Sequence, residues 1–260
     1  IFPGMEIIGI FQFRVTRNSD LYVDDEEVTD LRQALKGELS QRNYGDAVRI
    51  ETHKEISSFC MNYLLTEFKL EKKDCYLVDG PVNVGRLITL PESVVKPGLK
   101  FKFFSPKYPE YLKGGKLLFD YLKQEDILLH HPYECFDVVA EFINNAAEDK
   151  NVVAIFQTIY RTGSTSGLMR SLINAVNKGK EVTVILELMA RFDEETNINW
   201  ASKLEEIGAH VVFGVVGNKT HAKMCLIVRQ EGKKLIRYCH LGTGNYHPKT
   251  AKLYTDFSLL

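Results

Sequence analysis

His221 and Lys223 form an HxK pattern at the start of an apolar run, NKTHAKMCLIV. Successive side chains of an extended strand point to opposite faces, so these two basic groups would project from the same face. A neutral imidazole is available as a nucleophile near pH 7, since its unperturbed pKa is about 6.5. Solvated charges at a strand end would give the same pattern, and the triplet taken alone favours that interpretation.

Two arginines occupy corresponding places in the preceding sequence. Arg161 ends the predicted strand 151–161, Arg191 ends the predicted strand 181–191, and GVVGNKT after the next strand leads directly into His221. In open α/β sheets, ligands bind at the carboxyl ends of the strands. Two arginines and a histidine delivered to one edge therefore predict a local anion site.

Two glycine-containing loops would border the same edge. TGSTSG begins the helix after Arg161, where free N–H groups could face phosphate oxygens. For Ser164 or Ser166 individually, a plain N-cap is the preferred interpretation. HLGTGNYHPKT follows a later strand and would let the backbone around Asn245 approach a ligand closely. A tight turn without function would have the same sequence.

Other histidines compete with His221 for the role of nucleophile. His130 and His131 are adjacent and would point apart, and the proline after them favours a helix entry over a strand end. His247 beside the glycine loop could reach the site, whereas His240 on a strand is typical of a packed core histidine. His221 is therefore the preferred candidate.

The elements that would position these residues divide the chain in two. Roughly the first hundred residues mix strand and helix patterns, and three prolines between Pro97 and Tyr111 then interrupt the periodicity. From about Asp126, strands alternate with helices, which indicates βαβ crossovers and a parallel sheet buried on both faces. We expect an α/β protein with an α+β domain at 1–107 and a second domain at 108–260.

Composition limits the partners and the compartment. The 34 acidic and 33 basic side chains give a net charge of −1, so an anion site must be local, and no nucleic-acid partner is expected. The five cysteines lack a zinc-type spacing, and no apolar run approaches the roughly 18 residues that cross a bilayer. These features predict a cytoplasmic protein with reduced thiols. The apolar ends indicate a chain that continues on both sides.

The HxK pattern followed by a G-T-G-N loop resembles the half-site of the phospholipase D superfamily. In that chemistry a histidine attacks phosphorus, a lysine offsets charge, and two half-sites face each other. Val228 stands where the superfamily carries an aspartate, which disfavours a general phosphodiesterase.

A closer resemblance covers essentially all 260 residues in order. The segments 178–224 and 237–260, with HHPYECF, TIYRTG, FRVTRNSDL and ELSQRNYGDAVRIE, resemble the bacterial polyphosphate kinase family with a phospholipase D-like core. The resemblance implies that 1–107 is a middle domain truncated at its start. It implies that 108–260 is the first phospholipase D-like α/β sandwich domain, with a mixed, largely parallel sheet.

The same resemblance implies an activity and roles for individual residues. His221 would take the γ-phosphate of ATP as a phosphohistidine and pass it reversibly to inorganic polyphosphate. Arg161 and Arg191 would hold phosphate together with magnesium (Mg²⁺), and Tyr254 would lie against the nucleotide. Lys223 would act as a point charge by the phospholipase D analogy, and Asn245 belongs to the supporting loop.

The family also implies partners beyond ATP or ADP and polyphosphate. These are an N-terminal domain that contributes to adenine binding, a C-terminal domain with a second histidine, and further copies in a homo-oligomer. Association with a membrane is an alternative to a purely cytoplasmic location. Two other functions stay open: a noncatalytic polyphosphate-binding or assembly module, and a phospholipase D-like phosphodiesterase.

Overall fold

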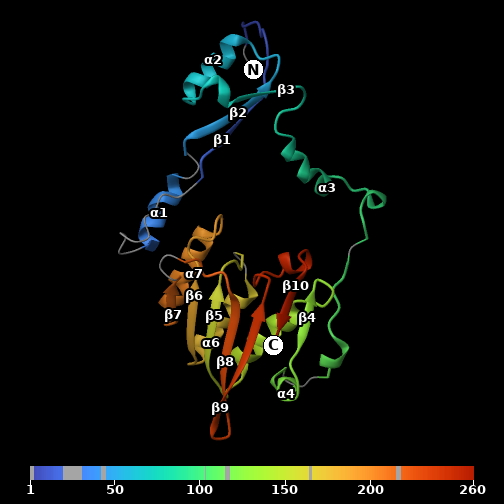
Figure 1. Ribbon diagram of the computed structural model, residues 1–260, viewed down its shortest axis with the longest axis vertical. Coiled ribbons are helices and arrows are strands. Elements are labelled where there is room, and N and C mark those ends of the chain that lie inside the picture. The colour runs from blue at the N-terminus through green and yellow to red at the C-terminus, as the bar shows by residue number, and fades with distance from the viewer. Residues whose placement is uncertain are drawn as a thin grey trace. The chain divides into compact units, whose positions relative to one another are not determined.

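The chain packs as two compact units in the computed structural model (Figure 1). The structure describes residues 3–19, 31–41, 45–102, 104–114, 118–163, 166–214 and 218–260. The first unit consists of Ile1–Val23 and Ala34–Lys102, and the second is built mainly from Phe103–Leu260. The sequence places the domain boundary between residues 107 and 108, a few residues further along the chain.

The first unit contains a three-stranded sheet of order β1-β2-β3. β1 (Phe13–Arg17) is antiparallel to β2 (Ala47–His53), and β2 is parallel to β3 (Cys75–Val78). Helix α2 (Ser58–Glu67) connects β2 to β3, and its N-cap Ser57 accepts a hydrogen bond from the Cys60 amide. This unit also contains α3 (Leu90–Ser93), the part of α1 (Leu31–Gln41) from Ala34 onward, and 3-10 turns at Lys72–Asp74, Val84–Thr89 and Pro97–Leu99.

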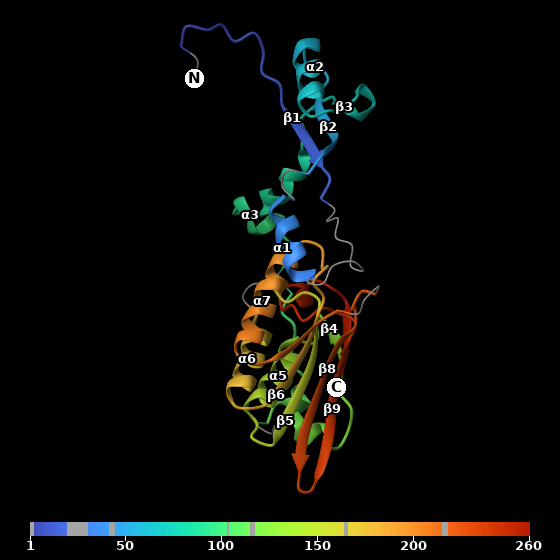
Figure 2. The same ribbon diagram turned by 90° about the vertical axis from the view of Figure 1, so that its left-hand side faces the viewer.

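The second unit is built on a seven-stranded sheet of order β4-β10-β9-β8-β5-β6-β7. Its strands are β4 (Leu128–His131), β5 (Val152–Ile159), β6 (Glu181–Leu186), β7 (His210–Phe213), β8 (Lys223–Glu231), β9 (Lys234–Gly242) and β10 (Asp256–Leu259). Its helices are α4 (Leu118–Leu122), α5 (Asp137–Glu148), α6 (Gly167–Asn177) and α7 (Glu194–Glu206), with 3-10 turns at Glu110–Leu112 and Thr250–Lys252. Figure 2 shows α5, α6 and α7 together on one face of this sheet.

Apolar residues at helical spacing fix the helices to that face. In α5, Val138, Val139, Phe142 and Ile143 are almost wholly buried, and Leu172 of α6 is fully buried. Removing such a side chain from water contributes roughly 1.5–3 kcal/mol. Because these helices cover one face of β5 and β6, the ends of these strands are held on a rigid support.

The predicted α/β class and mixed sheet are confirmed, but the expectation of a largely parallel sheet is wrong for the strand pairings. The pairings β5·β6 and β6·β7 are parallel. Four others are antiparallel: β5·β8, β8·β9, β9·β10 and β10·β4. The βαβ rule applies only where a helix connects consecutive strands, whereas β8 and β9 form a hairpin and β10 inserts between β9 and β4.

The prediction that His130 and His131 precede a helix entry is wrong. Both residues end β4, and α5 begins only at Asp137. His131 is buried, with its ring nitrogens 2.9 Å from Ser258 Oγ and 2.9 Å from the carbonyl oxygen of Glu134. The ring of His130 stacks on Phe257, with 4.5 Å between ring centres. Both histidine side chains therefore pack against residues of β10 and do not line the cavity described below, so neither is placed as the nucleophile.

The helices in the described part of the chain include none that is both long enough and apolar enough to span a bilayer.

Candidate active site

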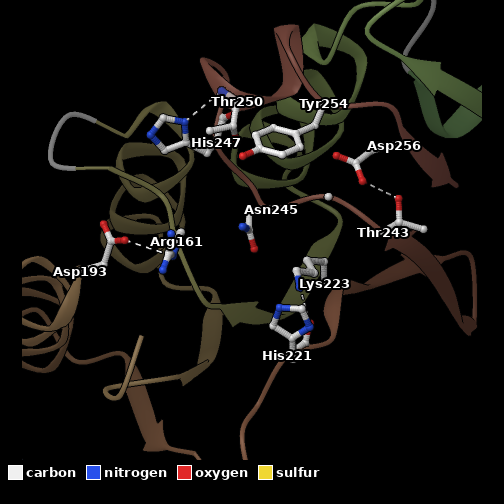
Figure 3. Close-up of a pocket in the computed structure, with 11 residues that line it drawn as sticks. Arg161, Asp193, His221, Lys223, Thr243, Asn245, His247, Thr250, Tyr254 and Asp256 are labelled. Carbon is white, nitrogen blue, oxygen red and sulfur yellow. Dashed lines mark hydrogen bonds and ion pairs between the residues drawn. The ribbon is translucent and has the colours of Figure 1, made fainter. Parts of the chain in front are cut away.

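Antiparallel pairing of β5 with β8 brings the end of one strand to the start of the other (Figure 3). The Thr158 hydroxyl stabilises this junction through two hydrogen bonds. It donates to the Ala222 carbonyl oxygen at 2.7 Å and accepts from the Met224 amide at 3.0 Å. Next to the junction is a cavity of about 310 Å³. It is lined by Arg161, Asp193, His221, Lys223, Thr243, Gly244, Asn245, His247, Thr250, Tyr254 and Asp256.

The imidazole of His221 lies edge-on against the ring of Tyr160, with 4.8 Å between ring centres. Partial burial, together with the positive charges of Lys223 and Arg161, lowers the pKa of His221 below its usual 6.5. The residue nevertheless stays accessible from the cavity. A neutral imidazole that a ligand can reach is the form that a nucleophilic histidine requires.

Lys223 is buried beside it at the first position of β8, with 7% of its surface exposed. Its Nζ donates to the His221 carbonyl oxygen at 2.6 Å and lies 5.4 Å from the centre of the Tyr160 ring. Burial lowers the pKa of Lys223, and the negative charge of Asp256 opposes this only in part. The expected juxtaposition of the HxK side chains at one cavity is therefore present.

Arg161 reaches the cavity from the segment after β5. Its Nε forms an ion pair with Asp193 Oδ2 at 3.2 Å, and its Nη2 donates to the Arg191 carbonyl oxygen at 2.8 Å. The guanidinium is thus held from two sides while remaining on the cavity wall. A planar guanidinium in this position can bind phosphate oxygens through paired hydrogen bonds.

Arg191 does not line the cavity, and β6 ends at Leu186, so Arg191 is not at a strand end as predicted. The structure gives its guanidinium a contact with the Phe192 ring, at 5.4 Å from the ring centre. Arg191 contributes its backbone carbonyl to Arg161 instead. The phosphate-binding role that the resemblance implies for its side chain stays a prediction.

The glycine loop closes the cavity opposite Arg161, with Asn245 directed into its centre (Figure 3). A side chain at Gly244 would overlap the Asp256 carboxylate, which explains the glycine. Thr243 Oγ1 donates to Asp256 Oδ1 at 2.8 Å and accepts from the Phe257 amide at 2.9 Å. Within the described part of the chain, the buried Asn245 Oδ1 has no hydrogen-bond partner.

Family models match most of the chain in two segments. Residues 1–90 match the polyphosphate kinase middle domain, and residues 117–260 match the polyphosphate kinase C-terminal domain 1. The chain belongs to the polyphosphate kinase family.

Curated relatives in this family are much longer than the chain. It is 56% identical over 264 aligned positions to the polyphosphate kinase of Paraburkholderia phytofirmans and 55% identical to that of Burkholderia ambifaria. Each alignment covers 100% of this chain and 38% of the relative. The crystal structure of polyphosphate kinase from Porphyromonas gingivalis matches 99% of this chain and 36% of that chain, with a TM-score of 0.76 and 24% identity. This match shows that the chain has the fold of the corresponding part of that structure.

The chain brings five of its six predicted site residues to one cavity. His221, Lys223, Arg161 and Asn245 line its interior, and Tyr254, 62% exposed, stands at the rim. Ser166 is the N-cap of α6, whose Met169 amide donates to its Oγ at 3.4 Å, and Ser164 lies outside the described residues. His240 is a core histidine as predicted, 1% exposed, and burial lowers its pKa to about 3.

Sequence reasoning missed two carboxylates of the cavity, Asp193 and Asp256. Asp193 immediately precedes α7, and acidic residues at a helix start are common for reasons of helix stability alone, so the sequence gives no sign of a cavity residue there. Asp256 reaches the cavity because β10 pairs with β9, a contact between residues that the local pattern does not reveal. The described residues contain no group of three or more His, Cys, Asp or Glu side chains that could hold a metal ion.

Proposed function

We propose that this chain is the nucleophile-bearing part of a polyphosphate kinase that moves the γ-phosphate of ATP reversibly to polyphosphate through His221. One observation carries the proposal: an accessible imidazole with a lowered pKa shares a cavity with Arg161 and Lys223. Phosphoryl transfer asks for an in-line nucleophile and for positive groups around the transferring phosphoryl, and this cavity offers both.

The chemistry proceeds in two displacements. In the first, a ring nitrogen of His221 attacks the γ-phosphorus, the bond from phosphorus to the bridging oxygen breaks, and ADP leaves with the bond electrons. In the second, a terminal oxygen of polyphosphate attacks the same phosphorus, the P–N bond breaks, and the imidazole is restored. Arg161 and Lys223 stabilise the negative charge on the equatorial oxygens in both steps.

Magnesium fits the donor set of this cavity as a companion of the nucleotide. Mg²⁺ is typically bound through one or two carboxylates plus substrate phosphates, and Asp193 and Asp256 are carboxylates on the cavity wall. Arginines cannot ligate a cation, so Arg161 and Arg191 would contribute through the phosphate they hold. Bound Mg²⁺ would neutralise charge on the phosphate oxygens of ATP.

The remaining parts of the whole protein complete the proposed enzyme. An N-terminal domain would contribute to adenine binding, with Tyr254 at the cavity rim lying against the nucleotide, and a C-terminal domain would bring a second histidine. The full-length protein would be a homo-oligomer in the cytoplasm or associated with its membrane. These assignments rest on the family, whose relatives extend well beyond the 38% that this chain matches.

The deciding experiment is labelling of the full-length protein with γ-labelled ATP and magnesium. We expect an acid-labile, base-stable label that disappears in His221→Ala. His130→Ala is the matched control, because His130 lies on β4 outside the cavity, and this variant should label normally. Undiminished label in folded His221→Ala would refute the assignment.

A further inference from the structure

A buried carboxylate outside the cavity joins two of the segments that form the site. Glu187 follows β6 directly, is 4% exposed, and does not line the cavity. Its Oε2 accepts from the Thr220 amide at 2.7 Å, and its Oε1 accepts from the Met189 amide at 3.0 Å. Thr220 immediately precedes His221, so one oxygen of Glu187 fixes the backbone on which the imidazole is mounted.

Asn197 of α7 extends this connection to the segment that carries Arg161. Its side chain is fully buried, and its Nδ2 donates to the Tyr160 carbonyl oxygen at 3.0 Å and to the Glu187 carbonyl oxygen at 2.8 Å. Tyr160 precedes Arg161 directly and contacts the His221 ring. The Glu187–Asn197 pair therefore holds, through backbone groups, the chain on both sides of the cavity.

We propose that Glu187, with Asn197, is a positioning residue that sets the His221 imidazole relative to Arg161. This inference rests on the proposed function of His221. Glu187 touches neither ligand nor reacting atoms; it acts through the Thr220 amide. A buried carboxylate destabilises the fold unless it is hydrogen-bonded. Here both oxygens accept from backbone amides, one of them in the segment that leads into His221.

Asp149 provides a matched comparison within the same sheet. It is also a buried carboxylate with 6% side-chain exposure, and its Oδ1 accepts from the Asn151 amide at 2.8 Å. Its Oδ2 pairs with Arg229 near the far end of β8. Asp149 thus supports the fold in a similar way at the end of β8 away from Lys223, through Asn151 and Arg229 and not through the backbone next to His221 or Arg161.

The test compares Glu187→Gln with Asp149→Asn in the full-length protein. A glutamine has only one accepting oxygen, so either the Thr220 or the Met189 amide loses its partner. For Glu187→Gln we expect the rate of His221 phosphorylation to fall by about tenfold or more, with the KM for ATP within about twofold, since misplacement affects the reacting geometry more than binding. Asp149→Asn should keep the rate within about twofold, even where its thermal midpoint falls further.

Hydrogen exchange of the peptides containing Thr220 and Met189 supplies a readout that does not depend on activity. We expect faster exchange at one of these amides in Glu187→Gln and unchanged exchange in Asp149→Asn. If wild-type protein takes no label, the proposed function fails, and this exchange measurement still decides the positioning role. Should Glu187→Gln not fold, Glu187→Asp, which keeps the charge but shortens the reach, is measured in its place. Unchanged exchange, or a rate no lower than that of Asp149→Asn, overturns the inference.

Discussion

Lys223 and Arg229 are two cations on the same buried face of β8, one near each end of the strand. They are similarly buried, with 7% and 9% of their surfaces exposed. Each also lies over an aromatic ring, Lys223 at 5.4 Å from the centre of Tyr160 and Arg229 at 5.5 Å from the centre of Phe119. The two environments differ in how the positive charge is compensated.

Arg229 is fully engaged by carboxylates. Its Nε donates to Asp149 at 2.8 Å and its Nη1 to Glu231 at 2.7 Å, while the Tyr238 hydroxyl donates to Glu231 at 2.7 Å. Burial acts to lower the pKa of Arg229, but its hydrogen bonds to Asp149 and Glu231 outweigh this effect, and the pKa is raised. This end of the strand has the charge balance of a structural ion pair.

Lys223 has a backbone carbonyl as its hydrogen-bond partner, and no carboxylate of the described chain lies within ion-pair distance of its Nζ. Burial lowers its pKa, with Asp256 opposing only in part. The protein keeps a desolvated charge next to the cavity without neutralising it. The same strand thus carries Arg229, a cation that stabilises the fold, at one end and Lys223, a cation available to an anionic ligand, at the other.

The sharpest test of this contrast exchanges each cation for methionine. Lys223→Met should lower phosphoryl transfer by about 100-fold, as removal of a preorganised electrostatic group does, with stability unchanged or slightly increased. Arg229→Met should destabilise the fold by about 3 kcal/mol, because it leaves buried carboxylates unpaired. Transfer rates and urea denaturation of the full-length variants measure the two effects. Equal losses of activity in both variants would contradict the assignment of Lys223 to transfer and Arg229 to stability.

Arg161 extends the contrast to the opposite cavity wall. Arg161→Ala should reduce transfer by at least about tenfold, or about 1.4 kcal/mol of transition-state stabilisation, while the fold stays intact. Arg191→Ala is expected to give a loss of similar size if its side chain holds phosphate in the whole enzyme. Steady-state kinetics on both variants measures this, and full activity of Arg191→Ala would remove its side chain from the site.

The pH dependence of labelling tests whether the positive charge of Lys223 acts on the His221 imidazole. The imidazole must be neutral to attack, so the rate falls as pH drops through its pKa, and the lowered pKa places this acid limb below pH 6.5. Removing the positive charge in Lys223→Met raises the pKa of His221 and moves the limb to higher pH. Arg229→Met should leave the limb in place. A limb that does not move in Lys223→Met would show that the lysine charge does not reach the imidazole.

Substitutions of the aromatic residues that contact the two cations should have the smallest effect on transfer. Tyr160→Leu should lower transfer by about twofold to fivefold, because a cation–π contact is worth about 0.5–1 kcal/mol, and Tyr160→Phe should restore most of the rate. Phe119→Leu, at the Arg229 end, should change stability and leave transfer unaffected. Single-turnover labelling and thermal melting distinguish the two. Loss of transfer in Phe119→Leu would contradict the view that the Arg229 end of β8 serves stability alone.

Local sequence pattern was sufficient for the parts of the site that lie on alternating strands and at their ends. The period-two pattern in HAKMCLIV predicts that His221 and Lys223 project together, and both line the cavity, although β8 begins only at Lys223. Arg161, at the end of the predicted strand 151–161, also lines the cavity, two residues beyond the end of β5. Arg191 was misplaced because Leu188 and Ala190 are buried, 2% and 0% exposed, although they lie beyond the end of β6. Their hydrophobicity imitates a continuing strand.

Pairing between distant segments was beyond the reach of pattern. β10 enters the sheet between β4 and β9, with Ser258 opposite Gly242 and Asp256 opposite His131. This register brings the Asp256 carboxylate to the glycine loop, and it also makes His130 and His131 part of a strand. No periodicity in YTDFSLL or HHPY specifies those partners, because the register depends on pairing with β9 across a loop and with β4, which lies more than a hundred residues earlier in the chain.

The connection from β7 to β8 is a place where the chain can change in length. The two strands are separated by β6 and β5, so the connection spans three strand spacings, about 14 Å. Residues 214–222 lie between Phe213 and Lys223, and an extended chain of that length reaches roughly 30 Å. The connection is about twice as long as the span requires. We therefore expect it to tolerate insertions and deletions before Thr220, while the register of β8, and with it the choice of side chains that face the cavity, stays fixed.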